Sequence, residues 1–342
     1  MKRLKRIVSI IIWGVIAFNL LTAGILSMSG VQQFAGRKIA HAISDKLGTK
    51  IDIGRVSLGL FNRVIIDDVC LYDQRHKEML RVGRLSAKID MLPLAEGKIS
   101  ISSAQLFGAH ARLYRRNATT APNFQFVIDS LASKDTTSHT PLDLRISTLI
   151  IRHSSVSYDQ QDIPLSDQFT PAHLTVRDIS AHINLRALTD DSLNINVKRL
   201  GFREDAGLAV DRLSFALKAG RRNALLSHFL LQMPSSQLRI DTLTANYQFN
   251  EKGLVPGSLN FSGAIKDTEI TPSDLRCFMP SLKNFQRALS ITTDINGTDQ
   301  TINVPQLLVA TPEQDVDINV NGWISNWQAH PSWHLQVNKL AI

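Results

Sequence analysis

The sequence predicts a mainly β protein in which one N-terminal transmembrane helix precedes a long antiparallel sheet with a few short helices. Three observations carry this prediction. An uncharged run of 22 residues, Ile7 to Met28, follows a basic N-terminus. Apolar and polar residues then alternate from about residue 50 to the end of the chain, and residues typical of tight turns recur between the alternating segments.

The length and composition are those of a folded protein. The 342 residues suffice for two ordinary domains or one large β domain. A hydrophobic content of 44% is too high for a disordered chain. The two cysteines, Cys70 and Cys277, form no CxxC pair, so we expect two buried or idle thiols.

The net charge of +8 is concentrated towards the N-terminus. Residues 1–30 carry four basic and no acidic residues, residues 31–116 carry 15 basic and 8 acidic, and residues 117–342 carry 19 basic and 22 acidic. This excess fits either attraction to anionic lipid headgroups or a solvated basic surface. Nucleic acid is not a predicted partner, because the sequence shows no cluster of basic residues interleaved with stacking aromatics.

The uncharged run is predicted to be a retained membrane anchor. At about 1.5 Å per residue, Ile7 to Met28 spans roughly 33 Å, enough to cross the hydrocarbon core. A cleavable signal peptide has an apolar stretch of only about 7–15 residues, although Ser27-Met28-Ser29 offers a small-x-small pattern for cleavage. Four basic residues are predicted to hold the N-terminus in the cytoplasm: Lys2, Arg3, Lys5 and Arg6. The bulk of the chain then lies across the membrane, and in a diderm bacterium the predicted localisation is a single pass through the inner membrane with the bulk in the periplasm.

Residues 29–48 are predicted to form an amphipathic helix. Apolar residues recur at three- and four-residue spacing from Val31 to Leu47, and Gly48 suits a C-terminal stop. This helix either lies on the membrane surface or closes one end of the fold that follows.

From Lys50 onward the apolar period changes to two. Strict alternation gives each strand one face that is buried or covered by lipid and one face in water. The residues predicted to share the apolar side, and to line a groove, are Ile179, Ala181, Ile183, Leu185, Leu193, Ile195, Val197, Leu213, Phe215, Leu217, Leu243, Tyr247, Phe249, Leu259, Phe261, Ile265, Ile291, Ile295, Val316, Ile318 and Val320.

Turn residues between these segments predict a meandering antiparallel sheet. They are Asp190-Asp191, Asp205-Ala206-Gly207, residues 250–253 (NEKG), Asn296-Gly297 and Asn321-Gly322.

Two segments interrupt the alternation. Residues 129–143 (DSLASKDTTSHTPLD) are polar and are predicted to form a loop. Residues 271–288 are predicted to form a helix, with Thr271 as the cap, Pro272 in the first turn, and Pro280 as a kink or break. The apolar stripe of this helix is expected to pack against the sheet: Leu275, Phe278, Met279, Leu282 and Phe285.

The sequence holds no signature of catalysis or nucleotide binding. GxGxxG, GxxxxGK[ST], GxSxG and HExxH are absent. His330 and His334 have helical spacing, but Pro331 lies between them. The carboxylate pairs Asp67-Asp68 and Asp190-Asp191 are interpreted as strand-end or turn residues. We therefore predict that the protein is not an enzyme and has no catalytic residues, metal site or cofactor.

Short segments near the N-terminus carry a family resemblance. They are residues 48–61 (GTKIDIGRVSLGLF), 64–73 (VIIDDVCLYD), 79–82 (MLRV), 92–94 (LPL), 97–101 (GKISI) and 123–129 (NFQFVID). In this order after a signal anchor, they resemble the N-terminal part of the AsmA-like superfamily, most closely the TamB proteins of Bacteroidetes-type bacteria. The resemblance is densest over residues 1–130.

This resemblance implies a twisted antiparallel sheet over residues 49–342, curled into a taco-like groove with an apolar interior. It also implies a bridge between the two membranes of the cell envelope, with phospholipid and a BamA/TamA-like outer-membrane protein as partners. TamB proteins are generally much longer than 342 residues. We therefore expect the groove to continue beyond this chain, and a genomic stop codon directly after Ile342 would contradict that expectation.

Three readings of the alternation remain open. A lipid conduit is favoured because the alternation outlasts the length of an ordinary sandwich, because the inward set is aliphatic, and because the sheet begins beside a membrane. The alternative function is a scaffold that helps assemble outer-membrane β-barrel proteins by strand addition with a BamA-like partner. A closed structural β domain with a dry core is the third.

Overall fold

The computed structural model describes residues 29–59, 63–89, 99–132, 142–143, 147–165, 169–189, 192–250, 253–313, 315–326 and 330–341. The predicted anchor, Ile7 to Met28, and the basic residues before it lie outside these ranges. Within these ranges, no helix combines the length and the apolar character needed to cross a bilayer.

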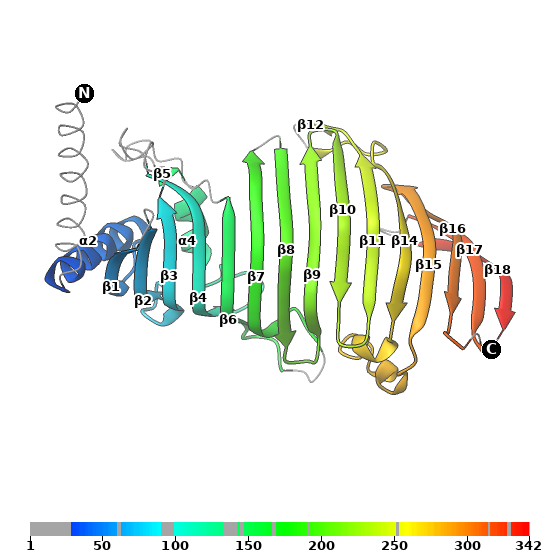
Figure 1. Ribbon diagram of the computed structural model, residues 1–342, viewed down its shortest axis with the longest axis horizontal. Helices are drawn as coiled ribbons and strands as arrows, with labels where there is room; N and C mark the ends of the chain where they lie inside the picture. Colours follow the sequence, from blue (N-terminus) through cyan, green and yellow to red (C-terminus); the bar gives the residue numbers. More distant parts are fainter. Residues whose placement is uncertain are drawn as a thin grey trace, which may run out of the picture. The chain divides into compact units, whose positions relative to one another are not determined.

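In the part of the chain that the structure describes, the protein is mainly β, as predicted. Fifteen strands form one open sheet in the order β1-β2-β3-β4-β6-β7-β8-β9-β10-β11-β14-β15-β16-β17-β18 (Figure 1). Neighbours in this order follow one another along the chain, which confirms the predicted meander. A sixteenth strand, the short β5, pairs in parallel with β4, so the sheet is mixed and not purely antiparallel.

The chain divides into two compact units that share β6 (Thr148–Gln160). The first unit comprises residues 1–146 and 156–162, and the second comprises residues 147–155 and 163–342.

The first unit packs two helices with its strands. Its elements are α2 (Ser29–Leu47), β1 (Ile51–Gly59), β2 (Arg63–Tyr72), β3 (Glu78–Ile89), β4 (Ile99–Arg115), α4 (Gln125–Ala132) and β5 (Leu142–Asp143). The helix predicted from Val31 to Leu47 is confirmed, and Gly48 ends it with a left-handed φ of 62°. A small core of Ile51, Leu71 and Met79 is completed by residues that include Leu47, Leu113, Phe124 and Phe126. Because α4 extends to Ala132, the segment predicted as a loop from Asp129 begins inside a helix.

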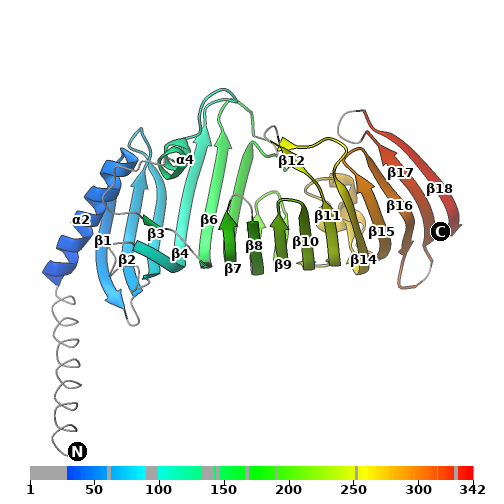
Figure 2. The same ribbon diagram turned by 90° about the horizontal axis from the view of Figure 1, so that it is seen from above.

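The second unit is a single layer of strands (Figures 1 and 2). Its sheet contains β7 (His173–Thr189), β8 (Ser192–Glu204), β9 (Ala209–Gly220), β10 (Asn223–Gln232), β11 (Gln237–Asn246), β14 (Asn260–Ile270), β15 (Leu289–Thr298), β16 (Thr301–Ala310), β17 (Asp317–Ser325) and β18 (Ser332–Ala341). A separate two-stranded ribbon, β12 (Phe249–Asn250) and β13 (Gly253–Leu254), follows β11.

Two predicted turns are in fact strand interiors. Asn296-Gly297 lies within β15 and Asn321-Gly322 within β17. Each glycine allows a neighbouring backbone to approach closely. A Cβ on Gly297 would collide with the Thr301 carbonyl oxygen, and one on Gly322 with that of His334. The turn prediction failed because an Asn-Gly pair looks the same whether glycine is needed for a turn or for close packing.

The predicted helix over residues 271–288 is replaced by two short 3-10 turns, η1 (Pro272–Leu275) and η2 (Pro280–Asn284). Pro280 starts η2 and so splits the segment as expected, because proline lacks the N–H that a continuous helix needs. Thr271 occupies the cap position, but its hydroxyl donates to the Ser235 carbonyl oxygen at 2.7 Å. The expected packing of the stripe is wrong for three residues that are 51–61% exposed: Phe278, Met279 and Phe285.

Residues with left-handed backbone interrupt several strands. In the second unit, Asp178, His228 and Asp267 have φ of 54°, 52° and 48°, and each lies at a register shift within its strand. Such bulges insert one extra residue and change which residues share a face. Aspartate and histidine tolerate this conformation better than most residues.

The Asp67-Asp68 pair lies inside β2, so its interpretation as a strand end is wrong. Asp67 forms an ion pair with Arg84 at 2.7 Å, and Asp68 has a left-handed φ of 55°. The Asp190-Asp191 pair lies outside the described residues.

Candidate functional site

One face of the second unit is apolar from β7 to β18. Directly paired residues of neighbouring strands lie on the same face of a sheet, so the register defines rows that cross the strands. We call the surface made by these rows the apolar face. Its first row is Leu193, Ala219, Ala224, Ala245, Phe261, Gly297, Ile302, Ile324 and Trp333.

Two more rows run beside the first. The second consists of Leu185, Ile195, Leu217, Leu226, Leu243, Gly263 and Ile295. The third begins with Ile183, Val197 and Phe215, and the stacked rings of Phe215 and Phe229, 6.3 Å apart, carry it across to β10. It continues through Ile240, Ile265, Thr293, Leu307, Val320 and Val337.

Shorter rows extend the face beyond the third. One joins Ala181, Leu200, Leu213, Leu231 and Leu238, and another joins Ile291, Val309, Ile318 and Leu340. Two threonines bring polar side chains to these rows. The Thr293 hydroxyl donates to the Gln306 carbonyl oxygen at 2.8 Å, and Thr268, which pairs with Ile291, accepts from the Arg239 backbone N–H at 3.0 Å.

The opposite face of the same strands is mostly polar. One of its rows is Asn194, Lys218, Leu225, Thr244, Ser262, Asn296, Asn303, Trp323 and His334. Polar members bond to one another across the strands, as Thr244 does with Ser262 at 3.0 Å. The sheet is therefore one-sided.

The apolar face is not sealed by a second layer of the described residues. Six members of its rows are buried, and most of the others are half-buried; the buried members are Ala181, Val197, Thr268, Thr293, Gly297 and Val320. Exposure is greatest at the last strands: Ile324 is 38% exposed, Val337 54% and Trp333 73%. In a closed sandwich, these side chains would be buried against a facing sheet.

Most predicted lining residues lie on this face, and Ile179 joins them by its alternation with Ala181 in β7. Four do not belong to the large sheet: Tyr247, Phe249, Leu259 and Val316. The Tyr247 hydroxyl donates to the carbonyl oxygens of Gly220 and Asn223 at 2.8 and 3.0 Å. This side chain therefore stabilises the turn between β9 and β10. Phe249 lies on the separate ribbon, and Leu259 and Val316 each precede a strand.

Sequence reasoning missed the contributions of β10, β16 and β18. In β10 the sequence NALLSHFLLQ contains leucine pairs in place of alternation. The bulge at His228 explains the pattern, because it brings Leu226 and Phe229 to the same face despite their odd spacing.

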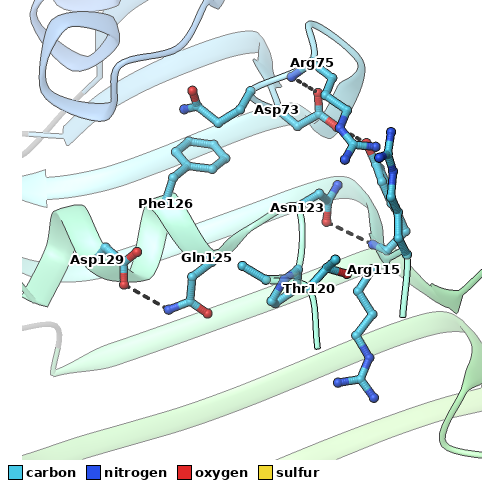
Figure 3. Close-up of a pocket in the computed structure, with 13 residues that line it drawn as sticks. Asp73, Arg75, Arg115, Thr120, Asn123, Gln125, Phe126 and Asp129 are labelled. Atoms are coloured by element: carbon cyan, nitrogen blue, oxygen red, sulfur yellow. Dashed lines mark hydrogen bonds between the residues drawn. The ribbon is translucent and has the colours of Figure 1, made fainter. Parts of the chain in front are cut away.

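A second candidate is a hollow of about 320 Å³ in the first unit. Its walls come from the β2–β3 turn, the end of β4, the turn that follows it, and α4 (Figure 3). Asp73 and Arg75 lie in the β2–β3 turn, Thr120 and Asn123 come from the turn after β4, and Phe126 comes from α4.

Asp73 organises one end of the hollow. Its side chain is 1% exposed and accepts hydrogen bonds from the Tyr114 hydroxyl (2.7 Å) and from the backbone N–H groups of Arg75 and Lys77 (2.8 and 2.9 Å). Burial alone would raise the pKa of Asp73, but these hydrogen bonds outweigh it and hold the pKa below its usual range. Burial and the adjacent carboxylate raise the pKa of Tyr114.

Neither a metal centre nor a reactive thiol is evident in the described ranges. No group of three or more histidine, cysteine or acidic side chains there is arranged to hold a metal ion. Cys70 and Cys277 are buried and free, and burial raises the pKa of both thiols, which makes them less reactive.

The chain matches no protein-family model, no curated protein and no solved structure.

Proposed function

We propose that the apolar face binds the acyl chains of phospholipid, and that the protein is an inner-membrane-anchored periplasmic bridge that passes phospholipid towards the outer membrane. The observation that carries this proposal is the set of apolar rows that cross the second unit without a covering layer. The membrane anchor and the resemblance to AsmA-like proteins supply the cellular context.

The energetics favour a distributed lipid-binding surface. Moving one CH₂ group from water to an apolar environment gains about 0.8 kcal/mol. With strands spaced about 4.8 Å apart, a row of nine strands extends roughly 40 Å, more than the ~30 Å hydrocarbon core of a bilayer. Because aliphatic side chains repeat in every row, a bound acyl chain can shift from one position to the next without leaving apolar surroundings. No single strong site is needed.

Photo-crosslinking tests which face meets lipid. A photoreactive amino acid is placed on the apolar face at Ile183, Ile195 or Phe215, and on the opposite face at the neighbouring Asn184, Asn196 or Ala216. These positions make a matched set, because Asn184, Asn196 and Ala216 are paired with one another on the opposite face of the same three strands. Phospholipid adducts are expected from the first set and from Phe261. Adducts confined to the second set contradict the proposal.

A further inference from the structure

The connection between β14 and β15 exposes large apolar side chains and buries polar ones. We call residues 271–287, which hold η1 and η2, the knob; it joins the ends of the two strands (Figure 1). Its Asp274 and Cys277 side chains are buried. Three large apolar side chains of the knob are more than half exposed: Phe278, Met279 and Phe285. Folded proteins usually bury phenylalanine and expose aspartate, so the exposed set indicates a surface that meets something other than water.

The base of the knob is fixed by hydrogen bonds to the turn between β10 and β11. The Asp274 carboxylate accepts from the Ser235 backbone N–H at 2.9 Å. The Thr271 backbone N–H donates to the Ser236 hydroxyl, also at 2.9 Å. Within the knob, the Ser273 N–H donates to the Phe285 carbonyl oxygen at 3.0 Å. Because the backbone is held in this way, little conformational entropy is lost when the exposed side chains bind.

A ring from another connection supports Phe278 from one side. Phe169, which lies between β6 and β7, packs edge-to-face on Phe278 with the ring centres 4.9 Å apart. The Phe169 N–H donates to the Cys277 carbonyl oxygen at 3.4 Å. Phe278 nevertheless remains 51% exposed, so this contact orients the ring and does not cover it.

The charges on the knob suit an anionic surface. Between Leu275 and Arg287 the sequence has three basic residues and no acidic ones. Arg276 and Lys283 are exposed, and neither forms an ion pair within the described residues. Arg287 is paired with Asp315, so its charge is already compensated.

The acidic groups in and beside the knob already have partners. Asp274 is buried and accepts from the β10–β11 turn, as described above. Glu204 is also buried and accepts from the Ala206 N–H at 2.8 Å. The next residue, Asp205, is paired with Arg177 at 2.6 Å. Two exposed cations and three exposed apolar side chains therefore share the outer surface of the knob.

The area of the exposed set favours a bilayer over a protein partner. Large apolar side chains have about 200 Å² of surface each, so three that are 51–61% exposed offer roughly 300 Å². A stable protein interface buries about 800 Å² on each partner. A fluid bilayer needs no complementary shape. Apolar side chains enter the boundary between its headgroups and acyl chains, and neighbouring cations meet its anionic headgroups.

We propose that the knob docks on an anionic phospholipid bilayer, inserting Phe278, Met279 and Phe285 below the headgroups while Arg276 and Lys283 contact them. The knob thus gives the second unit a membrane contact of its own. This contact does not require lipid on the apolar face, so this proposal and the proposed function can each fail without the other.

Vesicle flotation tests the knob with the full chain held in phosphatidylcholine nanodiscs. The vesicles contain phosphatidylcholine with about one-third phosphatidylglycerol, and nanodiscs without protein give the background. We expect the protein-bearing nanodiscs to float with the vesicles. Phe285→Ser should weaken this binding about fivefold, and serine at Phe278, Met279 and Phe285 together should weaken it at least about thirtyfold.

Phe249→Ser is the matched control, because Phe249 is as exposed as Phe285, at 61%, but lies on the β12–β13 ribbon. It should leave binding within about twofold of the unchanged protein. Phe285→Leu keeps an apolar side chain and should retain most of the binding, and circular dichroism checks that each variant folds. Absence of binding by the unchanged protein, or equal weakening in Phe249→Ser and Phe285→Ser, overturns the proposal.

Two comparisons test the cations. Binding should be at least about fivefold weaker on vesicles of phosphatidylcholine alone, and equally weakened on anionic vesicles when Arg276→Gln and Lys283→Gln are combined. Arg212→Gln combined with Lys218→Gln is the control, because these two exposed cations lie on β9, outside the knob. Equal binding to neutral and anionic vesicles overturns the anionic bilayer as the occupant.

Two further outcomes would assign the binding elsewhere. Leu226→Glu alters the apolar face and should leave vesicle binding unchanged; binding lost in Leu226→Glu and kept in Phe285→Ser would place it on the apolar face. Sedimentation of the nanodiscs without vesicles detects self-association. Self-association that Phe285→Ser abolishes, together with no vesicle binding, would make a second copy of the chain the occupant. Either result overturns the proposal.

Discussion

Asp73 shows how one side chain can shape a turn and the hollow beside it. The carboxylate is buried, yet every hydrogen bond it accepts comes from a donor within reach of the β2–β3 turn or β4. The sequence places Asp73 after a strand, where a turn aspartate is common. It does not show that Tyr114, 41 residues later, donates to the same carboxylate. Contacts over such sequence distances depend on strand register, which the local pattern does not specify.

Asp73→Asn is expected to destabilise the protein by about 1–2 kcal/mol at pH 7, because it replaces a charge-assisted hydrogen-bond acceptor in a buried site. The folded-state pKa of Asp73 is depressed, so its contribution to stability is full at neutral pH, declines below the ordinary pKa of the unfolded chain, and is lost as the pH falls through the folded-state pKa. The difference between Asp73→Asn and the unchanged protein should therefore shrink at pH 3. Urea unfolding at the two pH values measures it. Asp68→Asn, at an exposed position, is the control; an undiminished difference for Asp73→Asn at pH 3 contradicts this account.

At the scale of elements, the sequence predicted helices and strands correctly where their apolar period is regular, and failed where a bulge or a close backbone contact interrupts the period. The helix from Val31 to Leu47 and most alternating strands follow directly from periodicity. β10 was missed because its bulge breaks the period, and Gly297 and Gly322 were misread because their role depends on a neighbouring backbone. In each case the deciding information lies in the adjacent strand and not in the segment itself.

The bulge in β10 gives a test at this scale. His228 has a left-handed φ of 52°. This backbone conformation has a higher conformational energy for a β-branched residue than for histidine, and glycine adopts it without strain. His228→Val should therefore destabilise the protein by about 1–2 kcal/mol. His228→Gly should be neutral or slightly stabilising, and chemical denaturation compares the two. A valine variant as stable as the glycine variant would show that the bulge does not need this conformation.

At the scale of the whole molecule, the sequence predicted a one-sided sheet but not what meets its apolar side. Alternation of Ile195 with Asn196, for example, is the same in a sandwich, where a second sheet covers the face. In the structure, the described residues of the second unit form one layer of strands, and no second sheet of these residues covers the apolar face.

A charge placed in the second row should interrupt a lipid path. Leu226 pairs with Leu217 and Leu243 on the apolar face, while the adjacent Ser227 pairs with Ala216 and Thr242 on the opposite face. Leu226→Glu is expected to lower the transfer of fluorescent phospholipid between vesicles at least tenfold, since an acyl chain would have to pass a solvated carboxylate. Ser227→Glu should leave transfer within about twofold of the unchanged protein, a difference no larger than a surface substitution usually makes. Circular dichroism checks that both variants fold, and equal transfer by the two would contradict a path along the apolar face.

The central claim is that phospholipid contacts the apolar face and not its reverse, and two native tryptophans test it directly. Trp333 pairs with Ile324 on the apolar face, and Trp323 pairs with His334 on the opposite face of the adjoining strand. In full-length chains that each keep one of these two tryptophans, with all others replaced by phenylalanine, fluorescence is measured with brominated phospholipid. The account predicts quenching of Trp333 and little change for Trp323. Equal quenching of both, or quenching of Trp323 alone, would contradict it.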